Sequence, residues 1–404
     1  MRSVHVESAL LFASLSIGVH TCGDIADRDP LTRMVTNMEP ESLDTRETSN
    51  VTLSHRKEDL EEGGASAQLN DPQDLYTGSR ELNINVGERR RTYVLHVPPS
   101  YERTKRTPLL VAFHGRLGTG RLMEKMTGFS RLSDEHNFIA VYPDGVSKSW
   151  NAGLGLGVAS KLNVDDVGFV DRLLDLLMQE FAIDPHRIYL TGMSNGAALC
   201  YRLACELRHP IAAFAAVAGP EAVQVAQNCH PRHSISMLVI YGTADRIAQW
   251  DSSGPGLTGS ATVQRWIEVN KCASRPRVTL QVNQVRVETY RPCDAGVEVS
   301  VCRIEGGGHT WPGAAPLPGW ESVLGPTNQD ISASDLIWSF FSQHSLSTSV
   351  SLRWFNETTD DVSLTSDQPI DLNFAAGENS WLGVKEDTSA EPYANESKGR
   401  DPRP

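Results

Sequence analysis

Three kinds of motif are missing from this sequence of 404 residues. It has no two cysteines spaced as C-x-x-C, no H-E-x-x-H and no Walker-type glycine loop. Such patterns gather thiolates or imidazoles around a metal ion, or backbone N–H groups around a phosphate. The sequence therefore contains no motif that indicates metal, redox or nucleotide chemistry, and we predict neither a metal nor another cofactor.

The sequence also lacks a stripe of basic residues. The formal net charge is -13, and the excess acid belongs to the two ends of the chain: residues 24–75 carry 13 acidic and 5 basic side chains, and residues 346–404 carry 11 and 5. Nucleic-acid binding requires clustered basic side chains that face the phosphates. We therefore expect no nucleic-acid partner.

The hydrophobic stretch near the N-terminus, residues 9–19, is too short to span a bilayer as a stable helix. It follows Arg2 and precedes Thr-Cys-Gly, as in a secretory signal peptide. Glu7 and His20 depart from that pattern, and a buried N-terminal helix is the alternative. We expect residues 1–23 to be a signal peptide, the protein to be secreted, and no stable membrane anchor.

Cysteines are few, and their number bears on the compartment. Of the seven, Cys22 would leave with the signal peptide, and the six that remain permit disulfides. Cys272 and Cys293 flank a single strand-like segment and are the first candidates for a pair. Cys200 lies on a helical stretch and is expected to be a small buried residue.

The hydrophobic pattern separates a central domain from two polar ends. Residues 24–77 and 346–404 have no hydrophobic period that persists, so we expect an acidic disordered linker and an acidic disordered tail. Residues 78–345 alternate short apolar runs with helical patterns. That alternation predicts βα units and a mostly parallel central sheet.

Individual elements follow from the spacing of apolar residues. Residues 91–97 alternate as in a half-exposed strand. Denser apolar runs predict buried strands at residues 109–113, 138–142, 187–190, 213–217 and 237–241. Helices are predicted over 167–181, with Asp165 or Asp166 as N-cap and Asp184-Pro185 as the stop, and over 332–341.

The pentapeptide Gly192-Met193-Ser194-Asn195-Gly196 stands between a predicted strand and a predicted helix. In this setting a G-x-S-x-G elbow lifts a serine hydroxyl out of a sheet as a nucleophile. Side chains at the two glycines would collide with the neighbouring strand or helix. Ser194 is therefore the candidate nucleophile, and the backbone N–H of Asn195 is a candidate donor to an oxygen that gains charge.

A serine nucleophile needs a base that takes its proton. His309 is the candidate, because it lies in a glycine-rich loop directly after the predicted strand 297–304. Asp245, at the end of LVIYGTAD, would orient the imidazole. The order Ser, Asp, His is that of the α/β-hydrolase topology. Asp251, in a loop rich in Gly, Pro and Ser, is the rival acid, whereas Asp165 and Asp166 precede the serine and are interpreted as helix caps.

A second oxyanion donor is expected in the loop after residues 109–113, where His114-Gly115-Arg116 resembles the His-Gly turn of hydrolases. The backbone N–H of Arg116 is the first candidate, and that of Leu117 is the next. We interpret His114 as a turn residue beside the site, not as a metal ligand or second base.

Together these segments resemble a known family. TGMSNGAAL, YGTAD and GGGHTWPG, with AFHG, VYPDG, SWNAG and NVDDVGF, are similar to the polyhydroxybutyrate depolymerase and feruloyl esterase group of α/β-hydrolases. The resemblance covers about residues 78–345. It implies an α/β-hydrolase fold, with helices on both faces of a mostly parallel central sheet, and assigns Ser194, Asp245 and His309 as nucleophile, acid and base.

The resemblance also implies the substrate class. Family members are esterases, so the expected partner is a small-molecule, polysaccharide or polyester ester: a feruloylated or acetylated polysaccharide, or a short polyhydroxyalkanoate. By the same likeness Trp150, Asn151 and Trp311 line the acyl site. Trp250 is instead interpreted as a core or rim aromatic residue.

The sequence departs from the family at two places. Arg116-Leu117 stands where relatives tend to have a cysteine and a small polar residue, and Tyr241 stands where histidine is usual. Two other functions stay open: a noncatalytic binding protein on the same fold, which would be expected to have a broken triad, and an acyltransferase, in which an alcohol outcompetes water.

Overall fold

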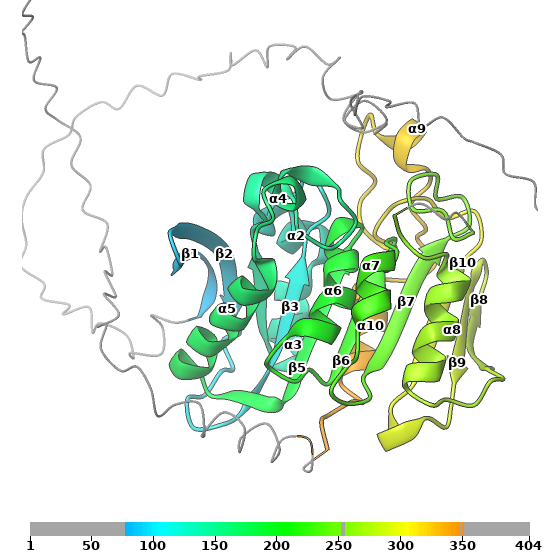
Figure 1. The fold of residues 1–404 in the computed structure, drawn as a ribbon. Helices are drawn as coiled ribbons and strands as arrows, with labels where there is room; N and C mark the ends of the chain where they lie inside the picture. The colour runs from blue at the N-terminus through cyan, green and yellow to red at the C-terminus, as the bar shows by residue number, and fades with distance from the viewer. Residues whose placement is uncertain (1–76, 252–254, 348–349, 351–404) are drawn as a thin grey trace, which may run out of the picture. The chain divides into compact units, whose positions relative to one another are not determined.

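The computed structural model describes residues 77–251, 255–347 and 350, which build a ten-stranded sheet flanked by helices (Figure 1). In chain order the strands are β1 (Gly78–Val86), β2 (Arg89–Val97), β3 (Thr107–Phe113), β4 (Ile139–Pro143), β5 (Ile183–Met193), β6 (Ala213–Val217), β7 (Ser236–Gly242), β8 (Arg277–Val282), β9 (Val285–Tyr290) and β10 (Val299–Ile304). The order across the sheet is β1-β2-β4-β3-β5-β6-β7-β10-β9-β8.

The six central strands, from β4 to β10 in sheet order, are parallel. The outer strands pair antiparallel on both sides. The predicted α/β fold with a mostly parallel central sheet is therefore confirmed. Because parallel strands end at the same edge, the loops that follow them can assemble one site.

Helices cover both faces of the sheet (Figure 1). Their bounds are α2 (Gly120–Thr127), α3 (Phe129–His136), α4 (Gly157–Lys161), α5 (Asp166–Glu180), α6 (Asn195–Glu206), α7 (Val223–Asn228), α8 (Gly259–Val269), α9 (Glu321–Leu324) and α10 (Ala333–Phe341), with short 3₁₀ turns η2 (Val146–Lys148) and η3 (Asp294–Gly296). Helices α5, α6, α7 and α8 lie on one face, and α2, α3 and α10 lie on the other.

The central strands are buried on both faces, as their dense apolar runs predict. In β3, Leu109, Val111 and Phe113 pack in the layer of α5 and α6, whereas Leu110 and Ala112 pack in the layer of α2 and α3. This alternation follows from the two-residue period of a strand. Helices on both faces therefore require apolar side chains at every position.

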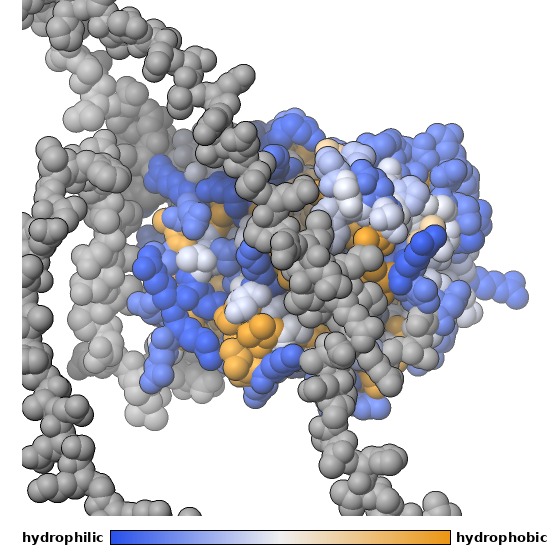
Figure 2. Space-filling view, turned by 90° about the horizontal axis from the view of Figure 1, so that it is seen from above, coloured by the Kyte–Doolittle hydropathy of each residue, from blue (hydrophilic) through white to orange (hydrophobic). Residues whose placement is uncertain are grey.

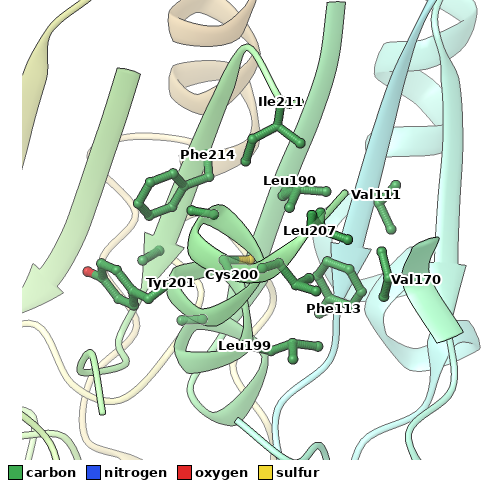
Figure 3. Close-up of a cluster of buried hydrophobic side chains, with 14 of the residues drawn as sticks. Val111, Phe113, Val170, Leu190, Leu199, Cys200, Tyr201, Leu207, Ile211 and Phe214 are labelled. Carbon is green, nitrogen blue, oxygen red and sulfur yellow. The ribbon is translucent and has the colours of Figure 1, made fainter. Parts of the chain in front are cut away.

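Helix α6 is embedded in the larger of these two layers. Nine of its twelve residues are buried, and Figure 3 shows Cys200 among apolar neighbours that include Phe113 and Leu190. Burial raises the pKa of the Cys200 thiol, which keeps it protonated. The prediction that Cys200 is a small buried residue is confirmed, and the start of α6 has a fixed position.

The prediction of a half-exposed strand at residues 91–97 is wrong. In β2, the residues from Tyr93 to Val97 are all buried. The reason is topological, because β1 pairs along the whole of β2 and takes the edge of the sheet. Alternation in sequence cannot reveal that another strand and the helices beyond it will cover the polar positions.

Helix α5 begins as predicted, with Asp165 as its N-cap: a side-chain oxygen accepts the N–H of Gly168 at 2.8 Å. The predicted stop is wrong. The helix ends at Glu180, and Asp184 and Pro185 lie inside β5, which begins at Ile183. The strand pairing of Thr107 with Ile183 extends β5 further towards its N-terminus than its apolar run indicates.

Asp166 is not a cap, which corrects the interpretation made from the sequence. Its carboxylate is fully buried and lies 2.8 Å from the guanidinium of Arg91 on β2. The other carboxylate oxygen accepts the backbone N–H of Asn151 at 2.7 Å. Burial raises the pKa of Asp166, and the nearby guanidinium opposes that rise.

Two disulfides are present among the described residues. Cys272 pairs with Cys293, as predicted, although the two flank the β8–β9 hairpin and not a single strand. Cys205 pairs with Cys229 and joins the end of α6 to the end of α7, which the sequence did not indicate. Cys302 is buried with a free thiol.

The expected signal peptide, linker and acidic tail lie outside the described residues, apart from a few positions at their borders. Within the described ranges, no helix combines the length and the apolar character needed to cross a membrane.

A buried carboxylate follows β6. Glu221 is 0% exposed, and its two oxygens accept hydrogen bonds from Arg265 at 2.9 Å and from the indole N–H of Trp266 at 3.2 Å. Burial raises the pKa of Glu221 to about 7, because Arg265 and Trp266 offset only part of the lost hydration.

This raised pKa predicts a pH-dependent stability. Between about pH 4.5 and pH 7 the folded chain retains a proton on Glu221 that the unfolded chain releases, so the free energy of unfolding falls as pH rises, by at most about 1.4 kcal/mol per pH unit. Urea unfolding of wild type and Glu221→Gln at pH 5 and pH 7.5 measures this. The stability difference between the two proteins should change with pH; an equal difference at both pH values contradicts the prediction.

Candidate active site

Ser194 occupies the sharp turn between β5 and α6, with φ 55° and ψ -115°. Positive φ is uncommon for a residue with a side chain and marks a turn that its surroundings enforce. A side chain on Gly196 would collide with the carbonyl oxygen of Phe113, and one on Gly192 would lie 2.5 Å from the carbonyl carbon of Gly196. The reason predicted for the two glycines is thus confirmed.

The backbone around Ser194 is firmly held. Its N–H donates to the carbonyl of Val217 on β6 at 2.9 Å, and its own carbonyl accepts the N–H of Ala198 at 3.0 Å. Among the described residues, the Ser194 hydroxyl has no hydrogen-bond partner, and the side chain is half-buried. The hydroxyl is therefore available at the carboxyl edge of the sheet.

Asp245 and His309 form a direct pair at the same edge. Nδ1 of His309 lies 2.8 Å from Oδ2 of Asp245, and both residues are only 4% exposed. The other oxygen of Asp245 accepts the backbone N–H groups of Ile247 and Ala248, each at 2.8 Å. With both oxygens engaged, the carboxylate orients the imidazole and leaves its Nε2 to accept a proton.

Close backbone contact brings the acid and histidine loops together. A side chain on Gly242, at the end of β7, would collide with the carbonyl of Gly307, which follows β10. The N–H of Ala244 donates to that same carbonyl at 2.9 Å. The rival acid, Asp251, is exposed, and the described carboxylate that binds the His309 ring is that of Asp245.

The segment around α9 fixes the histidine loop from its other side. The N–H of Gly308 donates to the carbonyl of Pro326 at 2.8 Å, and the N–H of His309 donates to the carbonyl of Leu324. A side chain on Gly308 would collide with the latter carbonyl. Figure 1 shows α9 above the sheet, beyond the end of β10.

His114 is a turn residue beside the elbow, as interpreted from the sequence. Its Nε2 accepts the backbone N–H of Gly145 at 2.9 Å, so the ring proton lies on Nδ1 and is donated to the carbonyl of Gly115 at 2.7 Å. Burial lowers the pKa of His114, which favours the neutral ring. Both nitrogens are occupied, so neither can bind a metal or act as a base.

The His-Gly turn lies directly against the elbow. A side chain on Gly115 would contact Cβ of Ser194 at 3.4 Å. The N–H of Leu117, the second-choice oxyanion donor, donates to the carbonyl of Lys148 at 2.8 Å and is therefore engaged. The N–H of Arg116, the first-choice donor, belongs to this same turn, and the N–H of Asn195 lies at the start of α6.

Trp150, Asn151 and Trp311, which are expected to line the acyl site, are all buried in the fold. Trp150 is 0% exposed and donates its indole N–H to the carbonyl of His114. The Asn151 amide binds the carbonyl of Val164. Trp311 is 2% exposed and donates its indole N–H to the hydroxyl of Ser334. Their placement therefore favours a supporting role.

Two further aromatic residues meet beside the acid loop. Tyr241 stacks on Trp250 with ring centroids 3.6 Å apart and an interplanar angle of 13°. The indole rests on Gly259, where a side chain would collide with the ring. This placement agrees with Trp250 as a rim residue, and burial raises the pKa of Tyr241 to about 12.

The loops after the strand ends form the face seen in Figure 2, where hydrophilic residues predominate and apolar residues form separate patches. Exposed apolar side chains on the loops after β3 and β4 include Leu117 at 41%, Leu156 at 39% and Val158 at 42%. They follow the same strands that carry the His-Gly turn and the Trp150 segment.

Within the described ranges, one group of three residues has the ligand atoms for a metal: Cys205, Glu221 and Cys229. Its two sulfur atoms form a disulfide, and Arg265 and Trp266 occupy the carboxylate. The group therefore does not fit a metal ion in this state.

Sequence reasoning missed the buried partners of the site. Arg91 and Asp166 are 75 residues apart, and no local pattern connects them. The NVDDVGF motif contains Asp166 and was the available signal, but capping explained both of its aspartates.

A model of the esterase PHB depolymerase family matches residues 91–253. This segment includes Ser194 and Asp245 and ends before His309.

Two curated relatives are similar over more than half of this chain. NocK from Nocardia uniformis subsp. tsuyamanensis is 29% identical over 287 residues, which are 65% of this chain and 81% of NocK. Feruloyl esterase B from Piromyces equi is 26% identical over 54% of this chain and 42% of its own length. This chain thus spans less than half of the second relative.

Among solved structures, the acetyl xylan esterase from Aspergillus awamori is similar with a TM-score of 0.46 at 16% identity, covering 65% of this chain and 99% of that one. The matched segment carries the elbow serine, and esterases are among the relatives, so this chain is similar to the esterase PHB depolymerase family.

Proposed function

We propose that the chain is a serine carboxylic-ester hydrolase that acts through an acyl-enzyme. The observation that carries this proposal is the buried pair of Asp245 and His309. The Asp245 carboxylate binds the imidazole with one oxygen and accepts two backbone N–H groups with the other. It stands at the same sheet edge as the strained elbow serine, Ser194. A noncatalytic protein would not require a buried Asp–His pair at the same sheet edge as an elbow serine.

In the proposed reaction, Ser194 attacks the ester carbonyl carbon while Nε2 of His309 takes the hydroxyl proton. The tetrahedral intermediate collapses, the imidazolium gives its proton to the leaving alcohol, and the acyl group stays on the serine. Water then repeats the cycle and releases the acid. The serine–histidine hydrogen bond often forms only once a substrate is bound, and the unpaired Ser194 hydroxyl agrees with that.

The oxygen that becomes negative requires donors that are already in place. We assign this role to the backbone N–H groups of Asn195 and Arg116. They belong to the start of α6 and to the turn after β3, and Gly115 allows these two segments to approach each other.

The substrate class follows from the relatives. Feruloyl and acetylxylan esterases are among them, so feruloyl or acetyl esters of polysaccharide are the first choice and short polyhydroxyalkanoates the second. The exposed Leu117, Leu156 and Val158 offer apolar surface near the proposed oxyanion turn. We also propose secretion, which the two disulfides support because such bonds persist in oxidising compartments.

The first test is hydrolysis of methyl ferulate, p-nitrophenyl acetate and hydroxybutyrate oligomers by wild type and Ser194→Ala. We expect turnover of at least one class and a loss of about 10⁴-fold or more in kcat in the variant, because the acyl-enzyme cannot form. Glycerol added as an acceptor separates hydrolysis from acyl transfer by its products. A folded wild type without turnover, and without labelling of Ser194 by a fluorophosphonate, would contradict the proposal and favour a binding protein.

A second test addresses the acid. In Asp245→Asn the side-chain oxygen can still accept from Ile247 and Ala248, so the amide N–H₂ faces His309 and forces the ring proton onto Nε2. We expect kcat to fall about 10⁴-fold with little change in KM, because the imidazole can no longer accept the serine proton. Asp251→Asn is the matched control and should retain activity. Equal losses in the two variants would contradict the assignment.

A further inference from the structure

One buried residue contacts both sides of the proposed oxyanion hole. The backbone N–H of Trp150 donates to Oδ1 of Asn195 at 2.7 Å, and Nδ2 of Asn195 donates back to the carbonyl of Trp150 at 3.2 Å. The indole N–H of Trp150 donates to the carbonyl of His114 at 2.9 Å. The backbone of Trp150 is thus hydrogen-bonded to the first residue of α6, and its indole is hydrogen-bonded to the turn after β3.

Each of these contacts fixes a peptide that matters for the reaction. Asn195 carries one proposed donor on its own backbone, and its side chain is tied to Trp150. His114 lies two positions before Arg116, which carries the other. The indole also packs edge-on against Phe113, with ring centroids 5.5 Å apart and an interplanar angle of 88°.

The segment that carries Trp150 is itself anchored to the fold. The N–H of Asn151 donates to the buried carboxylate of Asp166, which pairs with Arg91 on β2. The carbonyl of Asn151 accepts a hydrogen bond from Arg202 of α6 at 2.6 Å. The anchoring groups come from β2, α5 and α6, so the segment cannot move independently of the sheet.

We propose that Trp150 and the side chain of Asn195 form a strut that fixes the separation of the two oxyanion N–H groups. Both are positioning residues, because neither the indole nor the side-chain amide touches the reacting atoms. The inference rests on the proposed function, since an oxyanion hole acts only in acyl transfer.

The strut matters because oxyanion donors must lie about 2.7–3.1 Å from the place where the charged oxygen will form. A small displacement weakens contacts that are stronger in the transition state than in the ground state, so it lowers kcat and spares KM. Trp150 is fully buried, so loss of its indole N–H removes the buried donor of the His114 carbonyl.

The experiment compares Trp150→Phe, which removes the indole N–H, with Asn195→Ala, which removes the two side-chain hydrogen bonds to the Trp150 backbone. Trp266→Phe is the matched control, because Trp266 is also fully buried and donates its indole N–H to a buried acceptor, Glu221, away from the elbow. All variants are first compared with wild type by circular dichroism and thermal unfolding.

We expect kcat to fall about 10- to 100-fold in each strut variant, with KM within about twofold, because each change displaces a donor without removing it. The affinity for phenylboronic acid, whose serine adduct mimics the tetrahedral intermediate, should fall in parallel with kcat. The double variant should lose less than the product of the single losses, since both act through one strut. Trp266→Phe should lose thermal stability and keep kcat.

Amide hydrogen exchange tests the strut without turnover. The amides of residues 114–118 should exchange faster in Trp150→Phe than in wild type and be unchanged in Trp266→Phe. If wild type hydrolyses no ester, the proposed function fails, and the exchange rates still decide the strut. The inference would be overturned if the amides of residues 114–118 exchanged at the same rate in Trp150→Phe as in wild type. It would also be overturned if the strut variants lost no more kcat than Trp266→Phe. Should Trp150→Phe fail to fold, Asn195→Ala gives the same readouts.

Discussion

The close approach of α6 to the end of β3 is the constraint on which the rest of this structure depends. Gly196 lies so near the carbonyl of Phe113 that no side chain fits there. This contact places the elbow serine beside the His-Gly turn, where a side chain on Gly115 would be in van der Waals contact with Cβ of Ser194. The catalytic edge is therefore built first from backbone contacts. Side chains then complete a geometry that the glycines permit, and the buried underside of α6 keeps it from drifting.

Buried polar groups then lock the loops that the sheet edge brings together. A polar group removed from water must be hydrogen-bonded, or its burial is costly. Here those bonds run from side chain to backbone: Asn195 to Trp150, Trp150 to His114, and Asp166 to the N–H of Asn151. Loops have no ladder partners of their own, so such bonds are how an irregular segment acquires one conformation. The same logic holds on the acid side, where Asp245 binds two N–H groups of its own loop.

The sequence was informative where a local pattern has one physical meaning. The G-x-S-x-G turn, the dense apolar strands and the Asp165 cap each follow from spacing and sterics within a few residues. It was misleading where the decisive contact is remote. Burial of β2 depends on β1 closing the edge, the length of β5 on pairing with Thr107, and the role of Asp166 on an arginine 75 residues away. The SWNAG motif drew attention to Trp150 and Asn151, which are buried beside the elbow, but a motif does not tell whether a residue faces a substrate or supports the residues that do.

That last distinction bears on how such a site can change its substrate. The groups that define the proposed chemistry, His309, Asp245 and the elbow at Ser194, are held by a buried hydrogen bond or, at Gly196, by a contact too close for any side chain. The apolar side chains of Leu117, Leu156 and Val158, in the segments that follow β3 and β4, are instead exposed to solvent. Substitutions there alter shape and apolar area at little cost to folding, because surface changes away from caps and buried networks are nearly neutral. In the proposed function, the groups that set the reaction type and those that set the substrate preference therefore belong to different parts of the same edge, and the first are tied more closely to the stability of the fold.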